Sequence, residues 1–581
     1  MYKSKSKFGL LMLLGATSLS LAACGHSKSA QSKPDKFQQA VPKKTIKDGG
    51  TLTEPIVVET PFTGIFLDEL SDTAPDGEAV APGDETLFSE DEHLAINDKG
   101  AATLRLNQKN RNATIRVKDK VRWSDGVPVT AKDLVYSYEI IANAKSQSTQ
   151  YGSTYENIVG MKEYHDGKAK TISGLEMPDG PKGKTLVIHF KEMKPGMKQS
   201  GSHYIWENAA PYHYLKNVPF EKLISSDKVR KNPLFFGPYK MVKTVRGQST
   251  YWSRNPYYWR GKPHFDHVNL STISSSNVTQ AIKSHKFDVA EVPLSQYQEV
   301  KNSSAINFIG DKELAYNYVG FRVGRWDKKL GKNIQDKHAK MNNVNLRKAM
   351  LYAMNVEAVN QKFTHGLTFK VNTLVPKIFG DFHDSSIPGY GYNLKKANQL
   401  LDEAGYKKDG TYRRQPNGKK LTIHLAVRAG NSNTEPIWRN YIQQWNKVGL
   451  DVRFINGRPM EFNSWVQAIK DSDPRIDVFE GGWGLSGEPS QSHLYDENSP
   501  FNFARFVSPT NTKLLNEINS QKSFNHAYRV KKFHEWQRWM YDNAYLVPTS
   551  NSYSVTAVSD KVSGWSLKPS ANNWYNAGFV K

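Results

Sequence analysis

Apolar residues recur at two different spacings along the chain, and each spacing predicts a kind of element. In "WSDGVPVTAKDLVYSYEII" the apolar residues from Leu134 to Ile141 share one helical face, and Thr130 and Asp133 before them have the spacing of a capping box. A second amphipathic helix is predicted over 397–404, with Gly405 just after its end. Stretches such as "TLTEPIVVETPF" are instead rich in β-branched residues bounded by Gly and Pro, which is typical of strands. The alternation of such strands with helices predicts an α/β protein.

The first apolar run has a different character. Three lysines within Met1–Lys7 precede an apolar segment, Phe8–Ala23, that ends in small residues. This is the layout of a secretory signal, and it is short for a membrane span. The only cysteine of the chain, Cys24, follows at once, and "LAAC" resembles the lipobox of bacterial lipoproteins. The resemblance implies cleavage before Cys24 and a lipid on its thiol; an ordinary signal peptide with an incidental cysteine is the alternative.

Composition excludes several classes of protein. The chain has 581 residues, of which 38% are hydrophobic, so it holds several structural units rather than one core. No later apolar run reaches the roughly 18 residues that a membrane helix needs. One cysteine forms no intramolecular disulfide. The formal net charge is +23, but the basic residues are spread along the chain, which argues against a nucleic-acid binder and suits a protein at an anionic surface.

One stretch departs from this basic balance. Between Glu59 and Asp98 there are twelve acidic residues and no Lys or Arg. A solvated face is the common explanation for such a run. The alternative is that part of the stretch lines a cleft and biases the charge of the ligand.

The patterns of enzymes are missing. The sequence has no Gly-x-Ser-x-Gly elbow, no His-Glu-x-x-His and no phosphate loop, and its histidines form no ligand pattern. Gly482, Gly484 and Gly487 formally spell the dinucleotide fingerprint, but Glu488-Pro489 follows where a helix should open. We therefore expect no catalytic residue, no metal and no cofactor. Close approach of a ligand backbone is the better explanation of these glycines.

Several motifs resemble one family. "WSDGVPVTAKD", "FFGPYKM", "RNPYYWRGKPHFDHV", "NVNLRKAMLYAMN" and "KKANQLLDEAGY" follow one another in the order found in family 5 extracellular solute-binding proteins, which serve ABC importers. The resemblance covers more than 400 residues. Details such as "PYHYLKNVPFEKL" are similar to the long oligopeptide-binding lipoproteins of lactic acid bacteria.

The resemblance implies a fold. It is the α/β clamp of periplasmic binding proteins (type II, cluster C), in which two lobes are joined by hinge strands and a further domain is inserted in the first lobe. We expect the hinge crossings near "LAYNYVGFRVG" and "NAYLVPTSNSYSV". The expected boundaries are 1–23 for the signal peptide, 24–50 for a flexible lipid-anchored tether, 51–91, 225–315 and 546–581 for lobe I, 92–224 for the inserted domain II and 316–545 for lobe III.

The resemblance also implies a function. The protein would be a monomeric receptor on the extracytoplasmic face of a Gram-positive membrane, held there by its lipid. It would capture oligopeptides between the lobes and deliver them to the permease and ATPase subunits of an ABC transporter. Another solute bound by the same fold, such as nickel, haem or an oligosaccharide, is the first alternative. A surface adhesin that has kept the fold is the second.

The family's binding loop matches "GGWGLSGEPS". This match carries over Gly482 and Gly484 as backbone contacts to a peptide and Trp483 as a wall of the site. In the best-known members an aspartate of this loop holds the peptide's amino group, and here Ser486 stands near that place. The missing charge favours a site that registers peptides loosely. Glu488 is the nearest acid, although in the family it belongs to the turn.

Three further residues complete the candidate set. Tyr151 matches a family tyrosine that reaches the ligand from domain II, with a half-buried loop tyrosine as the alternative. Asn502 and Arg505 in "FNFARF" could meet ligand carbonyls or a carboxylate. For both, hydrogen bonding within the fold is the more common use of such side chains.

Overall fold

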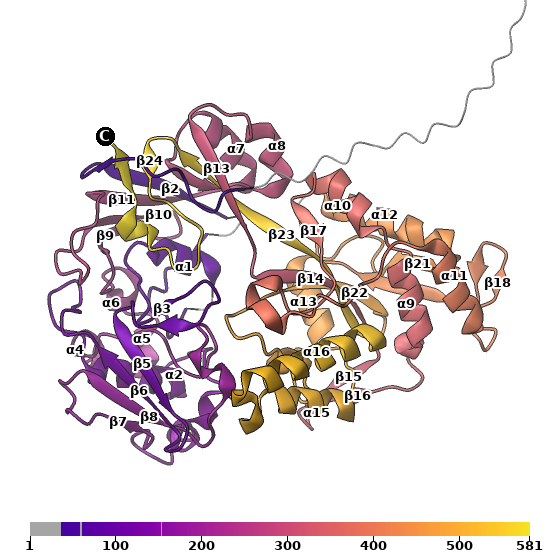
Figure 1. Cartoon of the computed structure of the whole chain (residues 1–581), viewed down its shortest axis with the longest axis horizontal. Coiled ribbons are helices and arrows are strands. Elements are labelled where there is room, and N and C mark those ends of the chain that lie inside the picture. Colours follow the sequence, from indigo (N-terminus) through magenta and orange to yellow (C-terminus); the bar gives the residue numbers. More distant parts are fainter. Residues whose placement is uncertain (1–36, 59–60, 72, 153, 431) are drawn as a thin grey trace, which may run out of the picture.

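The computed structural model describes residues 37–581 except 59, 60, 72, 153 and 431. Two lobes lie side by side, and long strands connect them (Figure 1). Cys24 and the predicted signal peptide 1–23 lie outside the described residues. Within these residues, no helix combines the length and the apolar character that a membrane crossing requires.

Lobe I is built on a sheet with the strand order β2-β11-β10-β9, which comprises Thr51–Val57, His267–Ile273, Ser249–Arg254 and Tyr239–Val245. β11 pairs in parallel with β2 and antiparallel with β10. Leu52, Trp252 and Val268 are fully buried where this sheet meets α1 (Ala74–Val80) and the C-terminal segment. That segment returns as β24 (Val562–Ser563) and β25 (Gly578–Val580), which pair with each other, and β25 also pairs with β1 (Ile46–Lys47).

The predicted tether 24–50 ends earlier than expected. Phe37 packs against the rings of Tyr297 and Tyr553, and Val41 is 4% exposed within the core of lobe I. The Val41 amide donates to the carbonyl oxygen of Trp565 at 3.0 Å. The prediction was wrong from residue 37 onward because these apolar residues are too widely spaced to form a period, and only the folded lobe gives them partners.

Domain II carries a separate core. Its sheet has the order β5-β6-β8-β7, formed by Ala102–Asn107, Asn112–Val117, Thr185–His189 and Leu175–Glu176. Helix α2 (Ala131–Ala142) packs on this core and begins with the predicted capping box, in which the Thr130 amide and hydroxyl donate to Asp133 at 2.7 and 2.9 Å. The prediction of this helix start is confirmed.

Lobe III has the largest core. Its central strands are β14 (Ala315–Phe321), β22 (Val478–Gly484), β20 (Thr422–Ala426) and β21 (Asp451–Phe454), adjacent in that order. Helices on the faces of this sheet include α11 (Leu394–Glu403), which ends as predicted before Gly405 with its φ of +79°. Trp445, Trp536, Phe479 and other buried residues fill the space between.

Two connections cross between the lobes. β13 (Ile306–Lys312) continues into β14, and β23 (Leu546–Ser559) is long enough to belong to both lobes. The first part of β23 pairs with β14 and β17 (Thr368–Lys370), and its second part pairs with β13 and β12 (Val289–Glu291). The crossings, together with the separate cores, support the domain boundaries expected from the sequence, which we retain as a proposal apart from the tether.

The described acids of the stretch 59–98 divide between two environments: Glu78, Asp91, Glu92 and Asp98 are exposed, as a solvated face predicts, and the others are partly or fully buried. Glu69 is 1% exposed and accepts from Trp206 Nε1 at 2.9 Å, while Asp68 accepts from the Asn208 amide, so that both carboxylates tie lobe I to domain II. Burial, with the neighbouring charge of Asp68, raises the pKa of Glu69 to about 7. These acids therefore serve as hydrogen-bond acceptors inside the structure.

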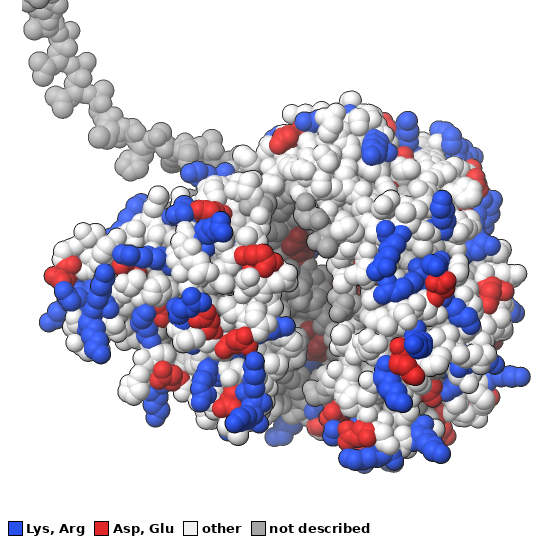
Figure 2. All heavy atoms as spheres, turned by 180° about the vertical axis from the view of Figure 1, so that it is seen from behind, with Lys and Arg blue, Asp and Glu red and all other residues white. Residues whose placement is uncertain are grey.

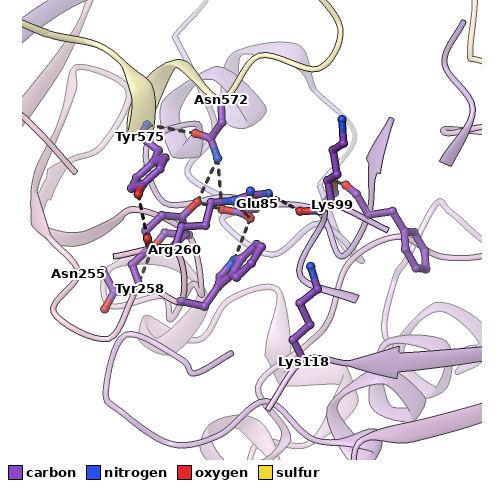
Figure 3. A network of polar contacts seen from close by, with 12 residues as sticks. Glu85, Lys99, Lys118, Asn255, Tyr258, Arg260, Asn572 and Tyr575 are labelled. Atoms are coloured by element: carbon purple, nitrogen blue, oxygen red, sulfur yellow. Dashed lines mark hydrogen bonds and ion pairs between the residues drawn. The ribbon is translucent and has the colours of Figure 1, made fainter. Parts of the chain in front are cut away.

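Glu85 forms a similar anchor, shown in Figure 3. Its carboxylate accepts from Tyr258 Oη at 2.5 Å and Trp259 Nε1 at 3.0 Å, and it lies 3.5 Å from Arg260 Nε. Asn572 of the C-terminal segment donates to Tyr258 Oη at 3.1 Å. The family motif "RNPYYWRG" is therefore held by an acid of the stretch 59–98 and by the end of the chain.

The remaining helices and strands connect these units. They are α3 (Met161–His165), α4 (Tyr212–Leu215), α5 (Phe220–Leu223), α6 (Asp227–Arg230), α7 (Ser275–Lys283), α8 (Tyr297–Val300), α9 (Val344–Tyr352), α10 (Val356–Thr364), α12 (Thr434–Lys447), α13 (Phe462–Lys470), α14 (Ser492–Tyr495), α15 (Pro509–Ile518), α16 (His526–Asn543), α17 (Asn573–Asn576), β3 (Ser89–Glu90), β4 (Ile96–Asn97), β15 (Gly324–Asp327), β16 (Lys332–Gln335), β18 (Lys408–Asp409) and β19 (Tyr412–Arg413), with the 3₁₀ turns η1 (Tyr155–Asn157), η2 (Pro195–Lys198), η3 (Leu294–Gln296), η4 (Lys340–Asn342), η5 (Lys377–Phe382) and η6 (Gln521–Phe524).

Candidate functional site

A groove runs between the two lobes, and acidic side chains lie deep within it (Figure 2). Strand β22 leads from the core of lobe III toward this gap. Beyond its last residue, Gly484, the chain turns into a loop that contacts domain II, since the Gly487 amide donates to the carbonyl oxygen of Ser200 at 2.9 Å. The glycine-rich segment is thus placed where the two halves of the molecule meet.

One face of β22 is bare at its end. Because side chains alternate along a strand, Gly482 and Gly484 present only hydrogen on the face opposite the Trp483 ring. A Cβ at Gly484 would meet nothing within 4 Å, whereas one at Gly482 would lie 2.8 Å from Asn317 Oδ1 and 3.3 Å from Arg428 Nη2. A ligand main chain could therefore approach β22 closely at Gly484, with an amide and a guanidinium beside it.

The other face of β22 is aromatic. The half-buried Trp483 ring stacks on Phe503 with centroids 5.5 Å apart, and Phe501 meets it edge-on at 5.8 Å. Trp483 Nε1 is buried, and the nearby Tyr495 hydroxyl interacts with it. Phe501 remains 41% exposed. These rings fix the end of β22 and supply an apolar wall.

The edge of β22 is open as well. β22 pairs with β14 along its whole length, but with β20 only at Val478 and Phe479, and no other described strand continues that edge. Arg428 lies beside it and pairs with Glu480 at 3.1 Å, while burial raises the pKa of the Glu480 carboxyl. Asn317 and Arg428 were missed by the sequence analysis, because each reaches the end of β22 from a distant part of the chain and neither carries a local motif.

Ser486 and Glu488 lie at the contact with domain II. Ser486 faces Gly201, where an added Cβ would be 3.3 Å from the Ser486 Cβ. Glu488 is 7% exposed and accepts from Arg529 Nη2 at 2.6 Å and from the Ser490 amide at 2.8 Å. The carboxylate of Glu488 is therefore paired within lobe III, and a role for Ser486 or Glu488 at a ligand stays a prediction.

Tyr151 is part of domain II. Its ring stacks on His165 at 3.8 Å, its hydroxyl donates to Glu156 Oε1 at 3.2 Å, and burial raises its pKa. These contacts fix the ring on domain II. They leave its predicted role as a ligand contact untested.

Asn502 and Arg505 are both fully buried. The Asn502 amide donates to the carbonyl oxygen of Phe506 at 2.9 Å, and its side-chain oxygen accepts from the Arg505 amide at 3.2 Å. The Arg505 guanidinium donates to five oxygens of lobe III at 2.8–3.1 Å. These bonds favour the structural alternative over contact with a ligand.

Lobe I contributes a cluster of carboxyl groups near the crossing strand β23. Burial and the charges of Glu78 and Glu291 raise the pKa of Glu54 to about 8, and burial together with Glu291 raises the pKa of Glu78 to about 7. Glu291 lies on β12, which pairs with β23. The mutual repulsion of these carboxylates favours protonation or a nearby cation. Among the described residues, no three His, Cys, Asp or Glu side chains come together as a metal site.

Two α/β lobes, joined by crossing strands and separated by a groove with an open strand edge, define a clamp-type solute-binding protein. A family model for bacterial extracellular solute-binding proteins, family 5 (middle region), matches residues 100–503. The chain therefore belongs to that family. Its members are transport components rather than enzymes, so the predictions of the family, of the two-lobed α/β fold and of a non-enzymatic protein are confirmed.

Similar proteins agree with this assignment. The chain is 40% identical over 528 residues to the oligopeptide-binding protein OppA of Lactococcus lactis subsp. cremoris, covering 90% of this chain and 88% of that protein. A solved structure of lactococcal OppA, complexed with an endogenous peptide in the closed conformation, matches with a TM-score of 0.81 and 39% identity over 91% of this chain and all of that one. NikZ from Campylobacter jejuni in complex with Ni(L-His) shares the fold at a TM-score of 0.69 and 19% identity, over 91% of this chain and 99% of that one.

Proposed function

We propose that this chain is the substrate-binding protein of an ABC importer and that it captures oligopeptides in the groove between its lobes. The observation that carries the proposal is the end of β22, where a bare backbone face and an open strand edge lie together. The 40% identity to lactococcal OppA over 90% of the chain supports a peptide as the ligand.

The mechanism follows from this geometry. An extended peptide adds to the open edge of β22, so that main-chain hydrogen bonds give affinity with little dependence on sequence. Gly484 lets its backbone come close, and Asn317 and Arg428 offer polar groups beside Gly482. Binding energy then favours the closed arrangement of the lobes, and the closed form is delivered to permease and ATPase subunits of other chains.

The position of the peptide's amino terminus along the groove is not fixed by a single anchoring charge. Ser486 stands where an acid would hold the amino group of a peptide, and the nearest acid, Glu488, is engaged by Arg529. Without a fixed anion at this point, no single peptide length is favoured. The family pattern of the loop and the pairing of Glu488 with Arg529 both support this loose placement.

A mixture of peptides of about 4–12 residues should raise the melting temperature of the protein, because a ligand that binds the folded state stabilises it by mass action. Free amino acids, nickel and cello-oligosaccharides should leave it unchanged. Thermal unfolding with each additive gives the answer. A shift with nickel or with a sugar alone would favour another branch of the family, and no shift with any solute would favour the adhesin.

The chain is further proposed to be lipid-anchored at Cys24 on the outer face of the membrane and to act as a monomer. Support comes from the sequence: a signal-like segment ends in "LAAC" at the only thiol of the chain. The first described residues, from Phe37, pack on lobe I, which leaves residues 24–36 as the connection between the lipid and the folded body.

Replacing Cys24 by serine should move the protein from the membrane fraction to the medium or leave its signal uncleaved, because serine offers no thiol for the lipid. Fractionation followed by intact-mass measurement distinguishes the two results. A substitution at the nearby Ser27, which lies outside the lipobox, should leave signal cleavage and membrane retention unchanged. Normal cleavage and full membrane retention of the Cys24→Ser variant would refute the anchor.

A further inference from the structure

Where domain II and lobe III meet, each contributes an apolar side chain that packs with the hydrophobic cluster of the other. Leu94 comes from the loop between β3 and β4, yet it is 6% exposed inside the hydrophobic cluster whose other members come from residues 316–547. In the opposite direction, Phe524 of η6 in lobe III packs against the cluster of domain II. Leu94 adopts a φ of 62°, which is unfavourable for a leucine, so its position is imposed by its surroundings.

Glycines allow the backbones to approach at this contact. A Cβ at Gly487 would lie 2.4 Å from the carbonyl oxygen of Ser200 and 3.0 Å from the Cβ of Leu94. A Cβ at Gly196 would lie 1.6 Å from Glu488 Oε2. The distance to the Ser200 carbonyl oxygen is too short for any other residue at position 487, whereas a side chain at position 196 would displace the Glu488 carboxylate from Arg529. A glycine on each side, Gly196 in domain II and Gly487 in lobe III, therefore lets the two backbones lie close together.

Hydrogen bonds complete the contact, and no ion pair joins domain II to lobe III among the residues that the structure describes. The Gly487 amide donates to the Ser200 carbonyl oxygen at 2.9 Å, and Gln199 Nε2 donates to the Gly487 carbonyl oxygen at 3.1 Å. Gln521 Nε2 donates to the Met193 carbonyl oxygen at 2.8 Å. Each of these bonds joins domain II to lobe III directly, so their formation does not require a ligand.

We propose that Leu94, Gly196 and the segment Gln199–Gly201 of domain II, together with Ser486–Glu488 and Gln521–Phe524 of lobe III, form a latch that stabilises the closed clamp. Leu94, Gly196 and Gln521–Phe524 are not among the residues proposed to contact the peptide, so through them the latch sets the affinity for the ligand from outside the binding site. That second statement rests on the proposed peptide-binding function. The latch itself concerns only the protein and holds whichever solute enters the groove.

The expected effect follows from a population shift. If the ligand binds the closed form, its apparent dissociation constant is the intrinsic one divided by the fraction of molecules that are closed or can close. Weakening the latch lowers that fraction. Affinity then falls although no residue at the ligand has changed, and the ligand dissociates faster.

A disulfide can measure closure in the absence of any ligand. An added Cβ at Gly201 lies 3.3 Å from the Ser486 Cβ, close to the span of about 3.5–4.5 Å that disulfides need. Gly201 has a φ of +67°, which strains any side chain there, so every rate is compared with that of the parent cysteine pair. In a Cys24→Ser background, the pair Gly201→Cys and Ser486→Cys should cross-link under mild oxidation without peptide, and single-cysteine variants serve as controls. Adding Leu94→Ala to the pair should slow cross-linking by roughly tenfold, because a buried leucine contact of the closed state is lost.

A matched variant separates the latch from general damage. Leu330→Ala also removes a leucine side chain, but Leu330 is 63% exposed at the tip of the β15–β16 hairpin, so the cross-linking rate should stay as in the parent pair. Gly487→Ala should act like Leu94→Ala, and Gly391→Ala, which meets nothing within 4 Å, should not. Circular dichroism confirms that each variant is folded.

Two results would overturn the proposal. Unchanged cross-linking rates in both Leu94→Ala and Gly487→Ala would show that these contacts do not hold the lobes together. Slower cross-linking with unchanged peptide affinity would show that the latch does not set affinity. Failure of the parent protein to bind peptides would refute the proposed function alone, because the cross-linking rates in peptide-free protein would still report on the latch.

Discussion

Gly484→Val should weaken peptide binding by about thirtyfold to a hundredfold while leaving the fold as stable as before. A valine side chain would fill the bare face of β22 and hold the main chain of a peptide away from Gly484, so that the peptide is displaced from its hydrogen-bonding positions along the neighbouring strand edge. The loss of two or so main-chain hydrogen bonds, each contributing about 1 kcal/mol net, accounts for such a factor. Calorimetry with one defined peptide on both proteins measures the change.

The control for this change follows from the same strand end. A Cβ at Gly484 meets nothing within 4 Å, and valine suits a strand, so thermal unfolding without peptide should be unaltered. Gly391→Val, also in open space on lobe III, should alter neither binding nor stability. Equal peptide affinities for Gly484→Val and the parent protein would place the binding site elsewhere in the groove.

The ends of some helices could be predicted from the sequence, because each is determined by residues that are close together in the chain. The capping box of α2 needs only Thr130 and Asp133, and the end of α11 needs only a glycine at position 405 that tolerates a positive φ. The arrangement of two lobes was accessible in another way. It came from the family motifs and not from the periodicity of the chain.

The candidate site was accessible only in part. The glycines of β22 are contiguous and stand out in the sequence, but their neighbours Asn317 and Arg428 are brought to them by separate strands of the sheet. The latch depends on Leu94 and Gly487, which are almost 400 residues apart, and no local pattern distinguishes that leucine from others. Contacts of this kind follow from tertiary packing and could not be predicted from spacing.

The acidic stretch shows a further limit. Its composition suggested a solvated face or a cleft wall, whereas Glu69, Asp76 and Glu85 accept hydrogen bonds inside the structure. Their donors are Trp206, the Gly64 amide and Tyr258, two of which come from other parts of the chain. A run of like charges in a sequence suggests an exposed surface, because the hydrogen-bond donors that allow some of those charges to be buried are brought to them only by folding.

Arg505 illustrates the same limit at a residue where the consequence is large. The sequence left open a contact with a ligand or a structural role. In the structure, Arg505 is fully buried, its guanidinium bonds to Ser472 Oγ, to Asn333 Oδ1 and to three carbonyl oxygens, and burial lowers its pKa to about 10. The charge is stabilised by these oxygen dipoles and by the ring of Phe503, whose centroid lies 5.5 Å from Arg505 Cζ.

Arg505→Met should lower the free energy of unfolding by about 3–5 kcal/mol, because five oxygens lose the buried guanidinium as a donor while the apolar stem is kept. Urea unfolding followed by tryptophan fluorescence measures this loss. The matched variant Arg439→Met removes an exposed guanidinium paired with Glu435 on the surface of α12 and should cost under about 1 kcal/mol.

Under conditions where Arg505→Met is folded, its peptide affinity should stay within about threefold of the parent, since bonds within lobe III use the whole guanidinium. Normal stability with lost affinity would instead assign Arg505 to the ligand.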